Sequence, residues 1–287
     1  MRDAAAVLLA LCSSLMVGGA AVLGGVSSRK TSPIVAMAFA QGLSVVYVVP
    51  LALAESNWEW RDFNIGLAIG VATIGSLGFS FLAVQQAHIG AVNAIAGGVG
   101  ATTPAVYHAI VDRSVAAWVL VGVILACVAV GLVAITPREQ DPDHDGIPII
   151  TKHAVVLSVL SGLAFGAILI GFSYTTGRTH LVTTMGARLP LFAFLLVPYL
   201  FTKGIPKLEL PIWALVVSPA IVFTVSDMIL VAANHSGANA TAVATIVSMN
   251  PAWAALFSWL FVKERLGVPQ MAGLGVALMS IAAVTLG

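Results

Sequence analysis

Two ionisable side chains, Arg188 and Asp227, lie inside long apolar runs of this sequence. A charged side chain near the centre of a bilayer costs at least about 2.5–3.5 kcal/mol on insertion scales, so it normally faces the protein interior and has a partner. A short segment joins the two runs, which predicts adjacent antiparallel helices. At a rise of 1.5 Å per residue, both positions are about 21–24 Å from the same membrane face, so the two side chains can meet.

This pair could do one of two things. Arg188 could attract the anionic group of a substrate, with Asp227 as its resting partner. Alternatively, the two charges could neutralise each other and only hold two helices together. We favour the first interpretation, because ionisable residues inside a membrane so often have a function.

Neutral polar residues supply further candidates. Gln41 and Ser80 occupy the positions 147 residues before Arg188 and Asp227. Eight more lie on the helices expected near 90–110 and 237–262: Asn93, Thr102, Thr103, Asn239, Thr241, Thr245, Ser248 and Asn250. Most of these should form hydrogen bonds between closely packed helices. We keep Asn93, Thr103 and Asn250, together with Gln41 and Ser80, as candidate substrate contacts.

The composition is that of an integral membrane protein. Of the 287 residues, 59% are hydrophobic and 9% are charged, whereas a soluble domain has about 25% charged residues. The formal net charge is +1 without any long basic cluster, so nothing indicates nucleic-acid binding. Cys12 and Cys127 lie inside apolar runs, and two cysteines predict neither a disulfide framework nor a metal site. We therefore expect no metal and no cofactor.

Ten apolar runs are long enough to cross a hydrocarbon layer of roughly 30 Å. They read as helices, because they are long and do not alternate with a period of two. The first run follows Arg2 and could be mistaken for a signal peptide, but it matches the internal sixth run and is kept as a span. The ten runs lie near 4–28, 33–54, 63–86, 90–110, 115–135, 153–176, 181–202, 211–233, 237–262 and 268–286.

The two halves of the chain correspond at an offset of 147 residues. The matched positions are His88 with His235, Gly90 with Gly237, Ala91 with Ala238 and Pro104 with Pro251. A constant offset indicates two copies of one unit. Five helices in each copy is an odd number, so the copies must cross the membrane in opposite directions. We predict an all-α membrane protein with two inverted five-helix repeats, at residues 1–135 and 153–287, joined by a loop at 136–152.

The residues at the end of each half resemble a known family. The run from Pro251 to Glu264-Arg265-Leu266, followed by Gly273 and Gly275, is similar to the closing signature of the EamA family in the drug/metabolite transporter superfamily. Leu82-Ala83 and the segment from Gly90 to Pro104 carry the resemblance in the first half. Two departures are Asp112-Arg113, where the family usually has Glu-Arg, and Gln41, where many members have arginine. The resemblance implies a small-metabolite carrier, often an exporter, with a central cavity between the halves.

We therefore expect a secondary transporter, and more specifically an exporter, of a small polar or anionic metabolite such as an amino acid or organic acid. No phosphate-binding loop of the Walker type occurs, so ATP should not drive it directly. Alternatives in the same superfamily are a lipid-carrier flippase and a divalent-ion carrier. A membrane-embedded enzyme is least favoured, because no catalytic motif is present. Expected partners are the substrate, membrane lipid and, as one candidate, a coupling proton. The expected location is a cell membrane, of the bacterial inner type, with the protein as a monomer or homodimer.

Overall fold

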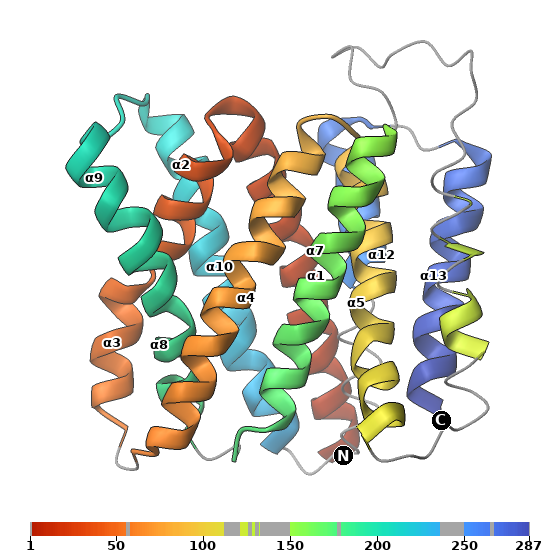
Figure 1. Ribbon diagram of the computed structural model, residues 1–287, viewed down its shortest axis with the longest axis horizontal. Helices are drawn as coiled ribbons and strands as arrows, with labels where there is room; N and C mark the ends of the chain where they lie inside the picture. The colour runs from red at the N-terminus through yellow and green to blue at the C-terminus, as the bar shows by residue number, and fades with distance from the viewer. Residues whose placement is uncertain are drawn as a thin grey trace.

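The computed structural model describes residues 2–55, 58–111, 121–125, 128–129, 132, 150–176, 179–235, 250–264 and 267–286. These residues form a bundle of helices, and no strand occurs among them (Figure 1). The expected all-α class is confirmed.

The bundle is built from long helices and short helical segments that follow one another directly. The first half contains α1 (Arg2–Lys30), α2 (Pro33–Met37), the π-helix η1 (Ala38–Gly42), α3 (Val45–Leu53), α4 (Trp60–Val84) and α5 (Ile89–Val111). The second half contains α7 (Lys152–Ser173), α8 (His180–Leu191), the π-helix η2 (Phe192–Leu196), α9 (Val197–Lys203), α10 (Leu210–His235), α12 (Asn250–Phe257), the π-helix η3 (Ser258–Val262) and α13 (Val268–Leu286).

Several of these helices can cross a membrane. Among the described residues, five segments are long and apolar enough: Val7–Lys30, Pro33–Leu53, Trp60–Val84, Lys152–Ser173 and His180–Lys203. They coincide with the first, second, third, sixth and seventh expected runs. Shorter apolar helices lie in the eighth and tenth runs, and α5 covers the fourth. Most of the fifth run and half of the ninth lie outside the described residues.

Polar residues at the helix starts explain where two of these segments begin. The Ser32 hydroxyl accepts a hydrogen bond from the Val35 amide at 3.2 Å, and Pro33 follows at the first helical position of α2. The Thr151 hydroxyl accepts from the Ala154 amide at 3.1 Å at the start of α7. Both are ordinary N-caps that satisfy an amide without a partner inside the helix.

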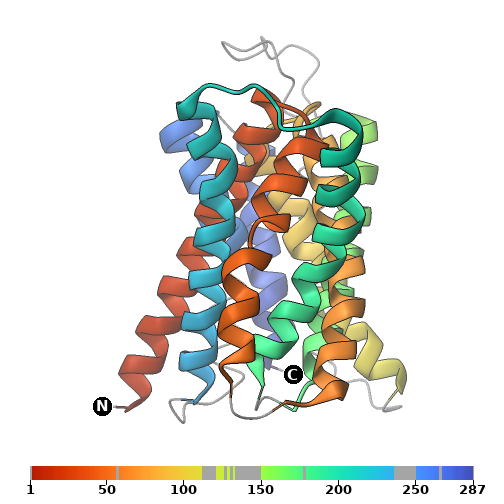
Figure 2. The ribbon, with the colours of Figure 1, turned by 90° about the vertical axis from the view of Figure 1, so that its left-hand side faces the viewer.

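Hydrogen bonds at the helix ends show the direction of each helix. Arg29, at the end of α1, donates to the Val84 carbonyl at the end of α4, at 2.7 Å. His153, at the start of α7, lies 2.9 Å from Gln86, just beyond α4. The end of α1, the end of α4 and the start of α7 therefore lie together, at what we name the Arg29 end of the bundle. It follows that α1 and α7 run in opposite directions (Figures 1 and 2).

Helices of the two halves pack against each other instead of forming two separate bundles. α1 packs along α10 and α12, while α4 packs along α7 and α8. α5 packs along α7. The sequence analysis expected the helices near 181–202 and 211–233 to be neighbours, because a short segment joins them. Leu196 of η2 shares a hydrophobic cluster with Val216 of α10. In the structure the main partner of α8 is α4, and the main partner of α10 is α1.

Glycines explain why α8 lies against α4. A Cβ atom on Gly66 of α4 would be 2.4 Å from the Thr183 carbonyl oxygen, and one on Gly70 would be 2.5 Å from that of Ala187. On the α8 side, a Cβ atom on Gly186 would be 2.5 Å from the Phe63 carbonyl oxygen. Only residues without a side chain permit this approach, which is typical of helix pairs in membranes.

A buried ion pair closes the Arg29 end. Arg29 Nη1 lies 2.8 Å from Glu264 Oε1, and the two side chains are 14% and 6% exposed. Arg29 Nη2 also donates to the Ala87 carbonyl at 2.6 Å, and the Gly90 amide donates to Glu264 at 3.3 Å. The chain reaches this position through Lys263, whose φ of 63° turns it out of η3. Glu264, which follows Pro251 in the second half of the chain, thus holds the start of α5 and the end of α1 together.

At the opposite end, carboxylates of the first half hold the start of α8. Asp62 is fully buried and accepts hydrogen bonds from the Thr176 amide at 3.0 Å, and from the Thr176 and Thr179 hydroxyls at 2.7 Å each. Thr179 is the N-cap residue of α8 but makes no side-chain cap. Glu55 accepts the Val182 amide at 3.3 Å instead. Carboxylates near a helix start are stabilised by its positive end.

The contact between α4 and α8 generates a first prediction. Gly66→Ala should lower the melting temperature in detergent clearly, because its Cβ atom would overlap the Thr183 carbonyl oxygen. Gly275→Ala on α13 is the matched control, since its Cβ atom would meet nothing within 4 Å. Alanine is favoured over glycine in a helix by up to about 1 kcal/mol, so the control should be unchanged or slightly more stable. Equal melting temperatures for the two variants would contradict the close contact.

A second prediction concerns pH. Burial raises the pKa of the Glu55 carboxyl, and outweighs the lowering by the Val182 and Leu181 amides. The folded protein then holds this proton more tightly than the unfolded chain. The stability that the folded protein gains from this proton is therefore fully present below the ordinary glutamate pKa of about 4.3, and it is lost as pH rises through the raised pKa. Glu55→Gln, which keeps an acceptor for Val182, should gain melting temperature relative to the wild type as pH rises through this window. A difference in melting temperature between the variant and the wild type that stays constant at all pH values would refute this prediction.

Candidate functional site

A cavity lies in the middle of the bundle, between helices of both halves. Its volume is about 250 Å³, and α1, η1, α4, α5, α7, α8, α10 and α12 all contribute to it. The apolar part of the lining includes Ile69, Leu77, Phe81, Phe165, Ile168, Leu169, Phe172 and Phe223. The polar part consists of Gln41, Thr73, Ser76, Ser80, Asn93, Ser161, Thr184, Arg188 and Asn250. Such a mixture, mostly apolar with a few polar groups, is typical of a small-molecule site.

Arg188 and Gln41 are in direct contact in this cavity. Nη1 of Arg188 donates to Oε1 of Gln41 at 2.7 Å, and the two residues are 8% and 3% exposed. They are 147 positions apart, which is the offset between the two halves. The sequence analysis named both residues and their correspondence, but it did not expect them to touch.

The elements that carry the pair are irregular at this point. Gln41 lies on the π-helix η1, and such turns often occur at functional sites. Arg188 lies in the last turn of α8, two residues before Pro190. Proline has no amide hydrogen and frees a carbonyl one turn earlier, near Gly186. The ring of Pro190 lies against Gly70, so the glycine contact between α4 and α8 also positions the turn that carries Arg188.

The other predicted contacts fall into three groups. Ser80, Asn93 and Asn250 line the cavity. Thr103 lies outside the lining, because its hydroxyl donates to the Val99 carbonyl at 2.7 Å and its side chain packs against Gly166 of α7. The side chain of Asp227 lies outside the described residues. Its pairing with Arg188 therefore stays a prediction.

The sequence analysis missed most of the apolar lining. Phe165, Ile168, Leu169 and Phe172 have the spacing of one helix face, and the structure turns this face of α7 to the cavity. Such a stripe could have been recognised from the spacing. In a chain that is apolar throughout, however, the same spacing also describes a face toward lipid. Only the packing of α7 between α4 and α5 distinguishes the two.

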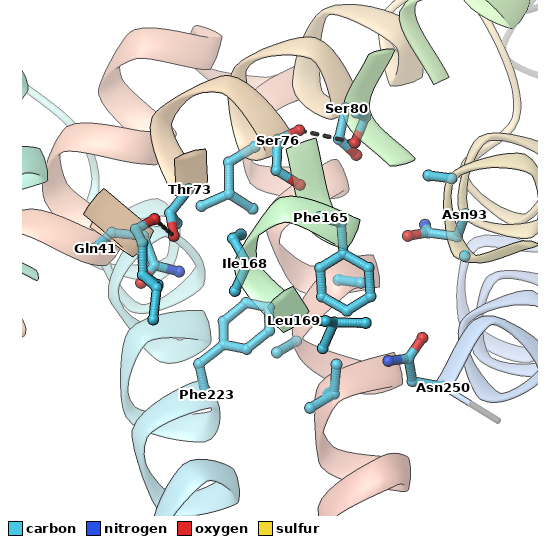
Figure 3. A pocket seen from close by; sticks show the side chains of 18 of the residues that line it. Gln41, Thr73, Ser76, Ser80, Asn93, Phe165, Ile168, Leu169, Phe223 and Asn250 are labelled. Atoms are coloured by element: carbon cyan, nitrogen blue, oxygen red, sulfur yellow. Dashed lines mark hydrogen bonds between the residues drawn. The ribbon is translucent and has the colours of Figure 1, made fainter. Parts of the chain in front are cut away.

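Polar groups lie at both sides of the cavity, and apolar side chains lie between them together with Ser76 and Ser80. Figure 3 shows Gln41 and Thr73 on one side, Asn93 and Asn250 on the other, and Phe165, Ile168, Leu169 and Phe223 between them. Arg188 is the one ionisable residue among the described lining residues, and it lies with Gln41. A guanidinium in apolar surroundings attracts anions strongly and binds carboxylates through two parallel hydrogen bonds.

Solved structures with the same fold exist. Fourteen chains match, and one of them, described only as "Crystal structure of protein", superposes with a TM-score of 0.61. Its sequence identity is 16%, over 100% of this chain and 99% of the other. At this identity the likeness shows the fold alone. No curated protein sequence matches the chain.

The second half of the chain matches a family model. The model of the EamA-like transporter family matches residues 152–286, which run from α7 to the end of α13. This range contains the run from Pro251 to Glu264 on which the resemblance was based. The family consists of membrane transporters, so a multi-pass membrane protein that moves a solute is the expected class. Residues 152–286 of this chain thus match the EamA-like transporter family, a part of the drug/metabolite transporter superfamily.

Proposed function

We propose that the protein is a secondary transporter, working as an exporter, of a small polar or anionic metabolite such as an amino acid or organic acid. The observation that carries this proposal is the contact between Arg188 and Gln41 in a cavity lined by both halves of the chain. We propose further that residues 1–135 and 153–287 are inverted five-helix repeats joined by 136–152, which expose the cavity to each side of the membrane in turn.

The packing of the helices supports the inverted repeats. Adding 147 to the residues of α1 gives α7, and adding it to those of α4 gives α10. The contact between α1 and α10 then corresponds to the contact between α7 and α4, with the roles of the two halves exchanged. α1 and α7 also run in opposite directions, as two such copies must. Secondary transporters of this plan bind their substrate near the midplane, at the interface of the repeats.

The lining of the cavity supports the same relation. Gly18 and Phe165, Ala21 and Ile168, and Ser76 and Phe223 are pairs at the offset of 147, and all six residues line the cavity. Gln41 and Arg188 are a further pair and touch each other. When corresponding residues of two copies are in contact, they lie close to the axis that relates the copies. A ligand in this cavity would thus touch both repeats, which alternating access requires.

In this proposal Arg188 binds the anionic group of the substrate. Without substrate, Gln41 accepts one of its hydrogen bonds and Asp227 is its predicted resting partner. An arriving anion offers a stronger, charge-assisted acceptor than the neutral amide of Gln41. The anion would therefore displace one or both partners. Asp227 could take up a proton at that step, which makes it the candidate for the coupling site.

The contacts at the two ends of the bundle suggest how the cavity could be closed off from each side of the membrane. At the Arg29 end, the Arg29–Glu264 pair holds α1 and α5 together. At the other end, Asp62 holds the start of α8. Both sets of contacts are made by buried charges on different helices, and they would have to loosen for the respective side to open.

A third prediction tests the role of Arg188. In reconstituted vesicles supplied with a panel of radiolabelled amino acids and organic acids, the wild type should exchange at least one compound. Arg188→Gln, which copies Gln41, should weaken the apparent affinity for it by roughly 10- to 100-fold, the size of a hydrogen bond to a charged group. Arg188→Lys keeps the charge and should retain clearly more exchange.

Stability must be followed in the same variants. Removing one partner of a buried charge pair costs about 3–5 kcal/mol, so Arg188→Ala should lower the melting temperature if Asp227 stays charged beside it. Arg188→Gln with Asp227→Ser copies the neutral residues of the first half and should be more stable than Arg188→Ala. If this double variant still exchanged substrate as the wild type does, the charge would have only a structural role.

A further inference from the structure

Two side-chain amides lie together on the side of the cavity away from Gln41. Asn93 belongs to α5 in the first half of the chain, and Asn250 belongs to α12 in the second half. Figure 3 shows both side chains turned toward the cavity from the same side. The two helices also pack against each other. A ligand group that reaches this side would therefore meet amides of both halves at once.

Glycines of the first half hold the backbone of Asn250 in place. A Cβ atom on Gly97 of α5 would overlap the ring of Pro251, the residue after Asn250. A Cβ atom on Gly18 of α1 would be 2.9 Å from the carbonyl oxygen of Asn250. Residues without a side chain permit this approach, which is typical of helix pairs in membranes. The position of Asn250 beside α5 is thus set by close packing, as a binding group requires.

A hydrogen bond within α5 fixes which atom Asn93 offers to a ligand. Nδ2 of Asn93 donates to the Ile89 carbonyl at 2.9 Å. A carbonyl oxygen only accepts, so the atom next to it must be the amide nitrogen and the orientation of the amide group follows from this bond. Oδ1 is then the atom that remains for the cavity. Asn93 therefore presents an acceptor and asks the ligand for a donor.

Asn250 adds both kinds of hydrogen-bonding group. No hydrogen bond joins its side chain to another of the described residues, so its amide can donate and accept. A hydroxyl or a carboxamide on a ligand has the same two capacities, and it can donate to Asn93 while it pairs with Asn250. A carboxylate only accepts, and its oxygens would face Oδ1 of Asn93 without a hydrogen atom between them.

The surroundings of the two amides favour a neutral group. The described elements that pack most closely against α5 or α12 are α1, α4, α7, α13 and η3. No Asp, Glu, Lys or Arg occurs at residues 4–28, 63–84, 89–111, 154–173, 250–262 or 268–286, which these elements contain. Arg29 and Glu264, which lie about one turn of α5 away at Gly90, already neutralise each other. A charged ligand group without an opposite charge is disfavoured at membrane depth.

We propose that Asn93 and Asn250 form a subsite that binds a neutral hydroxyl or carboxamide group of the substrate, an inference that rests on the proposed transport function and adds the group recognised on this side of the cavity. Asn93 accepts the hydrogen bond that the group donates, and Asn250 pairs with the same group. The subsite selects against a carboxylate at this position and against a compound that has no hydrogen-bonding group there.

Matched pairs of compounds test the subsite by their binding to the purified full-length protein in detergent. The pairs are 6-hydroxyhexanoate with hexanoate, 3-(4-hydroxyphenyl)propionate with 3-phenylpropionate, and glutamine with glutamate, each measured by titration calorimetry. In at least one pair the wild type should bind the first compound roughly 3- to 10-fold more tightly, the size of one hydrogen bond. The ratio of the two affinities is the readout, because a general loss of affinity lowers both alike.

Variants assign the preference to the two amides. Asn93→Leu keeps the approximate size of the side chain and should bring the ratio to about one, because the acceptor is lost. Asn250→Ala should lower the ratio in the same pair. Thr102→Val is the control on the same helix, since Thr102 donates to the carbonyls of Gly98 and Val99 and lies outside the cavity lining. It should leave the ratio as in the wild type.

The outcomes separate the subsite from the transport function. If the ratio falls in both asparagine variants but vesicles exchange none of the compounds, the subsite stands as a binding property and the transport function fails. If vesicles exchange a compound and the ratio survives both asparagine variants, transport stands and the subsite is overturned. The absence of a preference in all three pairs, or its loss in Thr102→Val as well, also overturns the subsite.

Discussion

The burial of one guanidinium governs how this bundle can be assembled. Arg188 is 8% exposed in the middle of a chain in which 9% of the residues are charged. In such surroundings the charge needs hydrogen-bond acceptors from other helices, and Gln41 supplies one at 2.7 Å. The two halves must therefore meet at this point. The glycines of α4 and α8 allow it, because they bring the backbone of α8 close enough for Arg188 to face the cavity.

The charges at the helix ends follow the same rule in a different setting. Arg29 neutralises Glu264 and also donates to the carbonyls of Val84, at the end of α4, and of Ala87, just beyond it, while Glu264 accepts the Gly90 amide at the start of α5. Among the described residues no cation is a hydrogen-bond partner of Asp62, which accepts one amide and two hydroxyls at the start of α8. In each case a charge replaces the hydrogen bonds that water would otherwise provide to a helix end. Glu264, in the charged segment 263–265 that carries the resemblance to the family, thus has a structural role.

Much of this could be predicted from the sequence, because hydropathy and rare charges carry most of the information in a membrane protein. The spans follow from apolar length, Arg188 stands out as a buried cation, and Gln41, Ser80, Asn93 and Asn250 stand out as polar residues on apolar helices. The all-helical class and the family follow from the same patterns. The inverted repeats rest on the offset of 147, with the packing of α1, α4, α7 and α10 as support.

Other features depend on packing that no local pattern encodes. Connection length suggested that the helices near 181–202 and 211–233 are neighbours, but the close approach at Gly66 and Gly186 makes α4 the main partner of α8. Electrostatics pointed from Arg188 to Asp227, a pairing that stays a prediction, and gave no indication of the contact between Arg188 and Gln41. Thr103 and Asn93 are both polar residues on one apolar helix, so the sequence does not distinguish them. Thr103 nevertheless faces α7, because Gly166 leaves room for it there. The aromatic lining of α7 is indistinguishable by spacing from a lipid-facing stripe.

The central claim is that the cavity between the two halves binds an anionic group at Arg188. The most direct measurement is a crystal structure with an iodinated ligand, 3-(4-hydroxy-3-iodophenyl)propionate, located by the anomalous scattering of iodine. The account predicts carboxylate density against the guanidinium of Arg188 and an iodine peak inside the cavity, on the side of Asn93 and Asn250. An iodine peak outside the cavity, or a carboxylate that does not touch Arg188, would contradict it.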